Sequence, residues 1–240
     1  MRLDIQDFGG YSTLDGTVKF YTRVRSLISE KTCVVDWGCG RGADTTDLPS
    51  LYRSRLKLFR GHAKKVIGVD IDISASKNPA VDQFYLLSSG RCPEIEAESI
   101  DLVVSDFVLE HVDNPDEFFD EISRILKPGG YFCARTTNKW GYVAVAARLI
   151  PKKLHNLVLS VLQPDRKPED VFPAPYRVNT VSAIVKKTNS HFDYAVEYEF
   201  AEPAYFGVSK IGILFGRFLH SILPNFLAPS LNVFLRKKYD

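Results

Sequence analysis

The sequence predicts an α/β protein with a mostly parallel sheet, because short β-branched runs alternate with longer helical patterns between residues 31 and 137. Three of these runs are continuously apolar, which is typical of strands buried on both faces: Val34-Val35, Val66-Ile67 and Leu102-Val103-Val104. We expect strands at 32–36, 65–70, 83–87, 100–105 and 131–135.

Helices are predicted before the first strand and between the later ones. Apolar residues at helical spacing indicate a helix around residues 18–28 and a clearer one at 115–126, which Lys127-Pro128-Gly129-Gly130 ends. Residues 138–180 contain many prolines around an amphipathic piece and are interpreted as an insertion that covers a site. Beyond it we expect helices at 181–187 and 208–223 and two further strands at 194–200 and 231–237.

Composition narrows the class of protein. The 240 residues are 45% hydrophobic and carry a net charge of +2, so a folded domain is expected and bulk attraction to nucleic acid is not. The positive charge is concentrated between Lys139 and Lys187. The four cysteines form no C-x-x-C pair, and no signal peptide is visible, so we expect a cytoplasmic protein with no metal site.

The segment VVDWGCGRGA, residues 34–43, joins a predicted buried strand to a helix through Gly38, Gly40 and Gly42. Glycine lets the backbone turn sharply and approach a ligand, so a nucleotide-like ligand is expected here. The spacing also fits the dinucleotide fingerprint of NAD enzymes. Asp36 would repel a pyrophosphate but suits a ligand with an ammonium group, and Asp70 can accept the hydroxyls of a ribose, so a nucleoside with a cationic tail is favoured.

Four motifs in order, VVDWGCGRGA, VIGVDID, SIDLVVSDFVLEHV and EISRILKPGG, resemble those of class I, Rossmann-like S-adenosylmethionine-dependent methyltransferases. The resemblance covers residues 32–135 and implies a three-layer fold with a seven-stranded, mostly parallel sheet, an antiparallel last strand and a helical insertion after the fifth strand. It implies one domain over 1–240, with an N-terminal lid and helix at 1–30, a cofactor-binding half at 31–137, a substrate-covering insertion at 138–180 and C-terminal strands and helix at 181–240. More loosely, the insertion resembles bacterial methyltransferases of glycan or lipid biosynthesis.

The resemblance also implies roles for single residues. Gly38, Cys39 and Gly40 would lie against the methionine part of S-adenosylmethionine, Asp36 near its amino group, and Asp70 at the ribose. The remaining residues expected to bind the cofactor are Gly42, Ile71, Ser105, Asp106 and Phe107. The family often has an acid after the third strand, whereas Ser88-Ser89-Gly90 stands here, so adenine would be bound through a backbone group or a hydroxyl.

Methyl transfer needs alignment of donor and acceptor, and a base helps when the acceptor is a hydroxyl. His111 is the candidate base or substrate-orienting residue; fixing its own loop by hydrogen bonds is an equally open role. The candidate acceptor-binding residues are Tyr21, Trp140, Tyr176 and Arg177, with core packing and capping as the alternatives.

The sequence therefore predicts methyl transfer from S-adenosylmethionine to oxygen of a small-molecule, sugar or lipid-linked acceptor, with S-adenosylhomocysteine as product. Methylation of RNA or protein, a non-catalytic S-adenosylmethionine-binding protein and an NAD-dependent oxidoreductase are the alternatives; no nucleic-acid partner is expected because no RNA-binding module is visible. The apolar stripe of the 208–223 helix is interpreted as core packing, with peripheral membrane contact as the other use.

Overall fold

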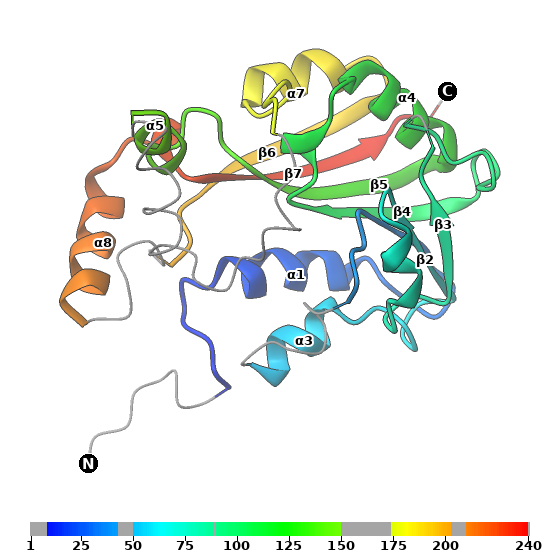
Figure 1. The fold of residues 1–240 in the computed structure, drawn as a ribbon, viewed down its shortest axis with the longest axis horizontal. Helices are drawn as coiled ribbons and strands as arrows, with labels where there is room; N and C mark the ends of the chain where they lie inside the picture. Colours follow the sequence, from blue (N-terminus) through cyan, green and yellow to red (C-terminus); the bar gives the residue numbers. More distant parts are fainter. Residues whose placement is uncertain (1–8, 43–49, 89, 150–173, 203–209, 240) are drawn as a thin grey trace.

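A computed structural model describes residues 9–42, 50–88, 90–149, 174–202 and 210–239. Their centre is a seven-stranded sheet with strand order β3-β2-β1-β4-β5-β7-β6 (Figure 1). The strands are β1 Cys33–Trp37, β2 Lys65–Asp70, β3 Gln83–Leu86, β4 Ile100–Asp106, β5 Leu126–Thr137, β6 Phe192–Glu199 and β7 Ser230–Lys237.

The direction of the strands confirms the predicted fold class. Strands β1 to β5 pair in parallel, whereas β7 is antiparallel to both of its neighbours, β5 and β6. Because β7 is antiparallel to both β5 and β6, β6 runs in the same direction as β1 to β5, and among the described strands β7 alone is reversed. All seven predicted strands are present within a few residues of their expected positions.

Helices cover both faces of the sheet and make the three layers that were predicted. In Figure 1, α1 and α3 lie on one face and α4 and α7 on the other. Each of these helices begins with a side-chain cap, such as Asp15 for α1 and Thr180 for α7. The helices are α1 Gly16–Ser26, α3 Leu51–Lys57, α4 Pro115–Ile125, α5 Tyr142–Leu149, α7 Val181–Thr188 and α8 Lys210–Ile222.

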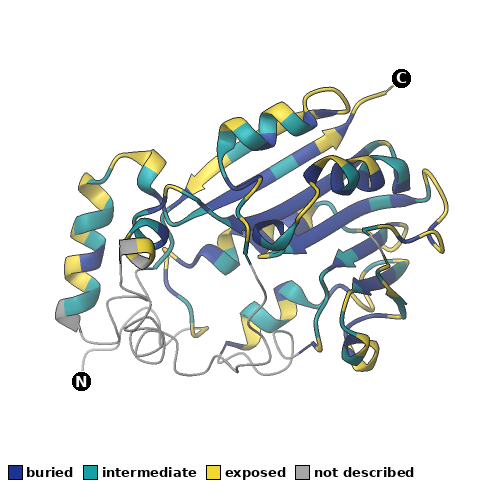
Figure 2. Ribbon diagram, turned by 45° about the horizontal axis from the view of Figure 1, so that its top comes forward, coloured by how far each residue is buried: buried dark blue, intermediate teal, exposed yellow. Residues whose placement is uncertain are grey.

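Two apolar cores, one on each face of the sheet, hold the layers together (Figure 2). Alternation along the central strands supplies both: Val34 belongs to the core under α1 and α3, and Val35 to the core under α4 and α7. The two continuous apolar runs in β1 and β2 are thus buried on both faces, as the sequence indicated. Packing of helices on both faces holds the sheet in place, and with it the carboxyl ends of the parallel strands.

The region after β5 is described only in part. Helix α5 follows β5, as expected for a helical insertion, and residues 150–173 of the predicted 138–180 insertion lie outside the described residues. Residues 1–8 of the predicted lid and residues 43–49, which follow the glycines in the sequence, lie outside them too. None of the helices in the described parts has the length and apolar character needed to cross a bilayer.

Strand β5 differs from its prediction by beginning at Leu126, not at residue 131. Leu126 pairs with Ile100, and the register then shifts before Leu102 pairs with Tyr131. Gly129 takes a positive φ of 77° in this stretch. The Pro-Gly-Gly sequence that indicated a break is therefore an irregularity inside one continuous strand.

Candidate active site

A cavity of about 630 Å³ opens at the carboxyl ends of β1, β2 and β4, where ligands bind in open parallel sheets. Its volume lies in the ordinary range for small-molecule sites. One wall holds the glycine turn after β1, and another holds the segment after β4. The lining residues are Trp37, Gly38, Gly40, Val69, Asp70, Ile71, Leu87, Gly90, Asp106, Phe107, Val108, His111, Val112, Asp113, Asn114, Glu117 and Phe118.

The turn after β1 takes a shape that requires glycine. Gly38 has a φ of +79°, and a Cβ built on it would lie 2.3 Å from a methyl carbon of Val108. Gly40 has a φ of +53°, with open space where a Cβ would stand. The side chain of Asn78 donates to the carbonyls of Cys39 and Gly40, at 2.8 and 3.1 Å, and holds the turn against the neighbouring loop.

Asp70 ends β2 beside this turn and is held in place by the backbone. One carboxylate oxygen accepts the N–H of Gly40 at 2.8 Å, and the other accepts the N–H of Asp72 at 2.9 Å. Each oxygen keeps a second lone pair, so both can still accept a hydroxyl from a ligand. Ile71 follows directly, lines the same cavity and is 62% exposed. This arrangement fits the ribose and adenine of the expected cofactor.

The charged lining of the cavity is acidic. Among the described residues that line it, Asp70, Asp106, Asp113 and Glu117 carry negative charge, and none is Lys or Arg. Apolar side chains fill most of the remaining wall. Because Asp106, Asp113 and Glu117 pair with Arg135, Arg177 and Arg91, the repulsion of a pyrophosphate and the attraction of a cationic ligand rest mainly on Asp70.

Asp106, at the end of β4, is the centre of a buried charge network. Arg135 donates to both of its carboxylate oxygens at 2.7 Å, and the hydroxyl of Tyr21 donates to one of them at 2.8 Å. The ammonium of Lys57 lies 3.4 Å from the same oxygen. Burial alone would raise the pKa of Asp106, but Arg135, Lys57 and Tyr21 hold it well below its usual range.

Tyr21 was expected to bind the acceptor, and the structure places it beneath Asp106. It is 5% exposed, and its ring has Arg135 on one side and Lys57 on another, at 5.4 and 5.2 Å from the ring centre. Burial first, and the charge of Asp106 second, raise the pKa of Tyr21 well above its usual value. The phenol therefore stays protonated and can keep donating to Asp106.

Arg135 and Lys57 are site residues that the sequence interpretation missed. Lys57 is the last residue of α3, and its side chain is 9% exposed and reaches Asp106. Arg135 also stacks on the ring of Phe107 at 5.2 Å. Phe107 has a φ of +57°, a conformation that few residues with a side chain adopt, and its N–H donates to the carbonyl of Arg135. The signal in the sequence that could have found Arg135 is a single charged residue at the end of an otherwise apolar predicted strand, 131–135.

His111 lines the cavity from the 3-10 helix Leu109–His111, which follows β4. Its neighbour Glu110 is buried and accepts the hydroxyls of Thr136 and Thr137 at 2.8 and 2.9 Å. These two bonds anchor the short helix to the end of β5. This anchor holds the backbone that carries His111 at the cavity wall.

The other candidate acceptor-binding residues lie next to the cavity rim and not in its wall. The guanidinium of Arg148 lies between Trp140 and Tyr176, 5.9 and 5.8 Å from their ring centres. The N–H of Tyr176 donates to the carbonyl of Glu110, and Arg177 pairs with the cavity residue Asp113 at 3.8 Å. These contacts bring the end of the insertion to the His111 segment.

Four predicted cofactor residues stand outside the cavity lining. Ser105 is fully buried in β4, and its hydroxyl has no hydrogen-bond partner among the described residues. Gly42 packs against Asn78, and Asp36 is half-buried in β1. Cys39 lies in the turn, where burial and then the charges of Asp36 and Asp70 raise its pKa to about 12, so the thiol is protonated and unreactive at neutral pH.

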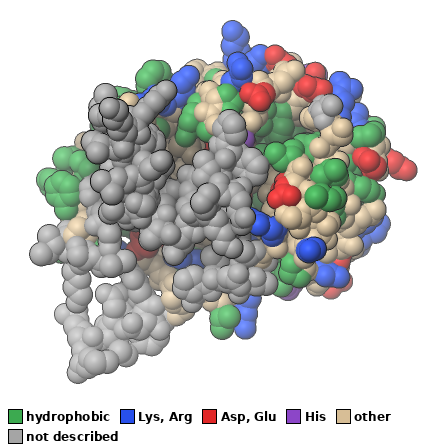
Figure 3. Space-filling view, viewed as in Figure 1, with side chains coloured by type: hydrophobic (Ala, Val, Ile, Leu, Met, Phe, Trp, Pro, Cys, Tyr) green, Lys and Arg blue, Asp and Glu red, His purple; other side chains and the backbone are tan. Residues whose placement is uncertain are grey.

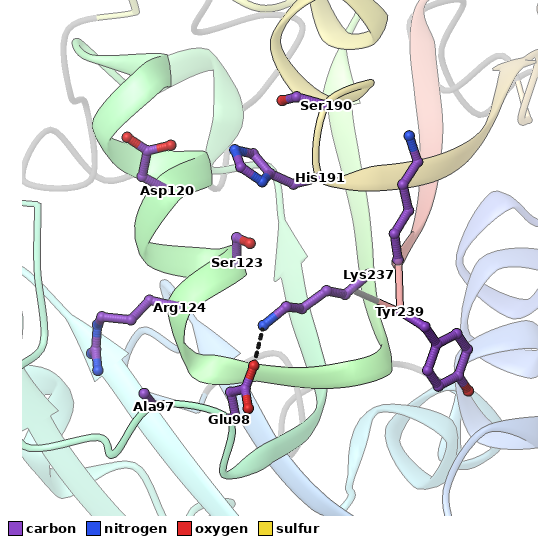
Figure 4. A pocket seen from close by; sticks show the side chains of 10 residues that line it. Ala97, Glu98, Asp120, Ser123, Arg124, Ser190, His191, Lys237 and Tyr239 are labelled. Carbon is purple, nitrogen blue, oxygen red and sulfur yellow. Dashed lines mark hydrogen bonds and ion pairs between the residues drawn. The ribbon is translucent and has the colours of Figure 1, made fainter.

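A second cavity, of about 650 Å³, lies at the opposite edge of the sheet, between α4 and the end of β7 (Figure 4). Lys237 crosses it and donates to Glu98 at 3.0 Å and to the carbonyl of Leu126 at 2.9 Å. Its charged groups include both signs, and no glycine turn borders it. We therefore place the candidate active site in the first cavity.

Comparison with known proteins agrees with the geometry. Residues 35–134 match the family model described as a methyltransferase domain. A mitochondrial ubiquinone biosynthesis O-methyltransferase of Dictyostelium discoideum is 32% identical over 120 residues, which cover 44% of this chain and 35% of that protein. The ubiquinone biosynthesis O-methyltransferase of Nitrosococcus oceani is 28% identical over 152 residues, 57% of this chain and 59% of that protein. The chain thus matches less than two thirds of either relative.

Solved structures share the fold at low sequence identity. A SAM-dependent methyltransferase from Aquifex aeolicus aligns with a TM-score of 0.51 at 15% identity, over 98% of this chain and 99% of that one. Geranyl diphosphate C-methyltransferase from Streptomyces coelicolor, solved with S-adenosyl-L-homocysteine, aligns with a TM-score of 0.51 at 14% identity, over 92% and 77%. Residues 35–134 thus match a methyltransferase domain, and the order of strands and the glycine turn are those of the Rossmann-like methyltransferase fold that these solved structures share.

Proposed function

We propose that this protein transfers a methyl group from S-adenosylmethionine to an oxygen atom of a small-molecule or lipid-linked acceptor. The observation that carries the proposal is the cavity at the carboxyl ends of β1, β2 and β4, whose charged lining among the described residues is acidic. S-adenosylmethionine has an ammonium and a sulfonium, and a carboxylate-lined, partly apolar cavity favours both.

The chain offers matching groups for each part of this cofactor. The backbone of Gly38 and Gly40 would lie against the methionine part, because neither residue has a side chain in the way. Asp70 would accept the ribose hydroxyls with its remaining lone pairs, and Ile71 would cover the adenine. Gly90 lines the cavity after β3, so its backbone is available to the adenine where the family often has an acid.

When bound, S-adenosylmethionine would supply the methyl group and leave as S-adenosylhomocysteine. The protein's part is to align the acceptor oxygen and to remove its proton. His111 is the candidate for proton removal: a ring nitrogen accepts the hydroxyl proton while the oxygen forms its new bond to carbon. The Glu110 anchor to Thr136 and Thr137 keeps the imidazole in place during this step.

Oxygen is proposed as the methyl-accepting atom because of the relatives, and the class of acceptor is proposed from the residues next to the rim of the cavity. Two O-methyltransferases of ubiquinone biosynthesis match more than a hundred residues each. The rim carries Trp140, Tyr176 and Arg148 in contact, a combination that suits an aromatic or sugar ring bearing an acidic group. We infer an acceptor with a ring, a hydroxyl and an anionic or lipid substituent.

The test begins with isothermal titration of S-adenosylmethionine, S-adenosylhomocysteine and, as the control ligand, NAD. We expect micromolar binding of the first two and none of the third. Transfer of a labelled methyl group to ubiquinone precursors, glycan extracts and lipid extracts then identifies the acceptor class. Binding of NAD without S-adenosylmethionine would contradict the proposal.

A further inference from the structure

Helix α8 and the turn after it expose an apolar surface. The residues of this surface are between 54% and 65% exposed: Leu214, Phe215, Phe218, Ile222 and Phe226. Figure 3 shows hydrophobic side chains at the left edge of the view, where α8 lies in Figure 1. A group of adjacent large apolar side chains on a protein surface often marks an interaction site, whereas a single exposed apolar residue does not.

The other side of α8 attaches the helix to the rest of the protein. His220 lies 2.9 Å from the hydroxyl of Tyr142 in α5, and its ring packs against Phe200. Arg217 pairs with Glu202 at 3.6 Å, and Gly216 is buried. Packing therefore uses one side of the helix, while Phe218 and Ile222 of the predicted stripe stay more than half exposed, which corrects the expectation that the whole stripe packs into the core.

Charge narrows the choice of partner. The sequences of α8 and of α5 beside it contain Lys210, Arg217 and Arg148 and no Asp or Glu. A second copy of this surface would bring no acid to face these cations, whereas anionic lipid head groups would complement them.

The position of the surface connects it with the cavity. Helices α5 and α8 lie at the end of the sheet where β5 ends and β7 begins (Figure 1). The cavity lies at the carboxyl ends of parallel strands, which is the same edge. A membrane against α8 would therefore lie beside the opening through which an acceptor enters.

We propose that α8 and the following turn dock on the surface of a membrane that contains anionic lipids, with Leu214, Phe215, Phe218, Ile222 and Phe226 buried at the boundary between head groups and acyl chains. The helix lies in the plane of this surface, as amphipathic helices with a polar side do. This goes beyond the proposed function, because docking needs neither the cofactor nor the acceptor.

The experiment measures sedimentation of the full chain with vesicles of phosphatidylcholine and with vesicles that also contain phosphatidylglycerol. The test variants are Leu214→Ser and Phe218→Ser. The matched control is Leu51→Ser, which removes an equally large side chain that is 74% exposed on α3. Titration with S-adenosylmethionine on the same samples reports folding and the proposed function separately.

We expect binding to the phosphatidylglycerol vesicles that weakens with salt, and a loss of roughly tenfold in vesicle affinity for each test variant. Leu51→Ser should bind as the unchanged protein does. Absence of binding to anionic vesicles, or equal loss in the control, would overturn the proposal whatever the cofactor titration shows. A dimer that dissociates on Phe218→Ser would also overturn it, because a second copy would then cover the surface.

Discussion

Replacing Arg135 by methionine should destabilise the protein strongly, because it removes the main partner of a buried carboxylate. Arg135 and Asp106 have side chains that are only 10% and 16% exposed, and two hydrogen bonds of 2.7 Å join them. Methionine fills similar space among the neighbouring rings but supplies no charge. Asp106 would keep its negative charge with fewer groups to neutralise it.

The size of the effect follows from what remains around Asp106. Removing one partner of a buried ion pair typically costs about 3–5 kcal/mol. Here Tyr21 still donates at 2.8 Å and Lys57 still lies at 3.4 Å, so the loss falls at the lower end. We expect the free energy of unfolding to fall by about 3 kcal/mol. Asp106→Asn should have a similar effect, since it removes the negative charge that Arg135 and Lys57 share.

The assay is urea unfolding followed by circular dichroism for both single variants and the double variant. Because the residues form one pair, the double variant should lose about 2 kcal/mol less than the sum of the singles. Arg60→Met is the matched control, since its pair with Asp82 is half-exposed and contributes less than about 1 kcal/mol. Additive effects, or a loss in Arg135→Met no larger than in Arg60→Met, would refute the network.

Three further outcomes are expected. Asp70→Ala should weaken S-adenosylmethionine binding by about 1–3 kcal/mol in titration calorimetry, and unchanged affinity would exclude its ribose role. His111→Ala should lower turnover by about 10²-fold at saturating acceptor if the imidazole removes the proton, whereas a near-normal rate would leave it only the role of holding the loop. Because the pKa of Tyr21 is raised in the folded state, its contribution to stability is complete below the unfolded value of about 10 and is lost as pH rises through the folded pKa. Urea unfolding from pH 8 to 11 should therefore show a steeper decline for the unchanged protein than for Tyr21→Phe, and equal slopes would mean that the phenol is not buried beside Asp106.

The strands were predictable because each is a local pattern. Val34-Val35 and Val66-Ile67 are apolar on both faces, and the glycines after the first run mark the turn into the cavity. The start of β5 was not predictable in the same way. Gly129-Gly130 favours a turn locally, but Leu126 gains a partner in Ile100, and pairing across the sheet extends the strand through the irregularity.

The site was predictable where it depends on one segment and not where it depends on several. The glycine turn and Asp70 belong to short motifs, and the structure places Gly38, Gly40 and Asp70 at one cavity. The network around Asp106 joins Tyr21, Lys57 and Arg135 from α1, α3 and β5, and no local pattern links residues so far apart in the chain. Sequence spacing therefore predicted the glycine turn at the cavity and did not predict the charged side chains of Lys57 and Arg135 that surround Asp106.

The reversed strand β7 sets an order in which the sheet can be completed during synthesis. Strands β1 to β5 can pair as soon as each leaves the ribosome, but among the described strands β6 pairs with β7 alone, which is made later. Until residues 230–237 have emerged, the edge of β5 is open to any other extended chain. A chain whose residues 230–237 are not yet available would thus have its first five strands assembled and β6 unattached, a state exposed to proteases and to aggregation.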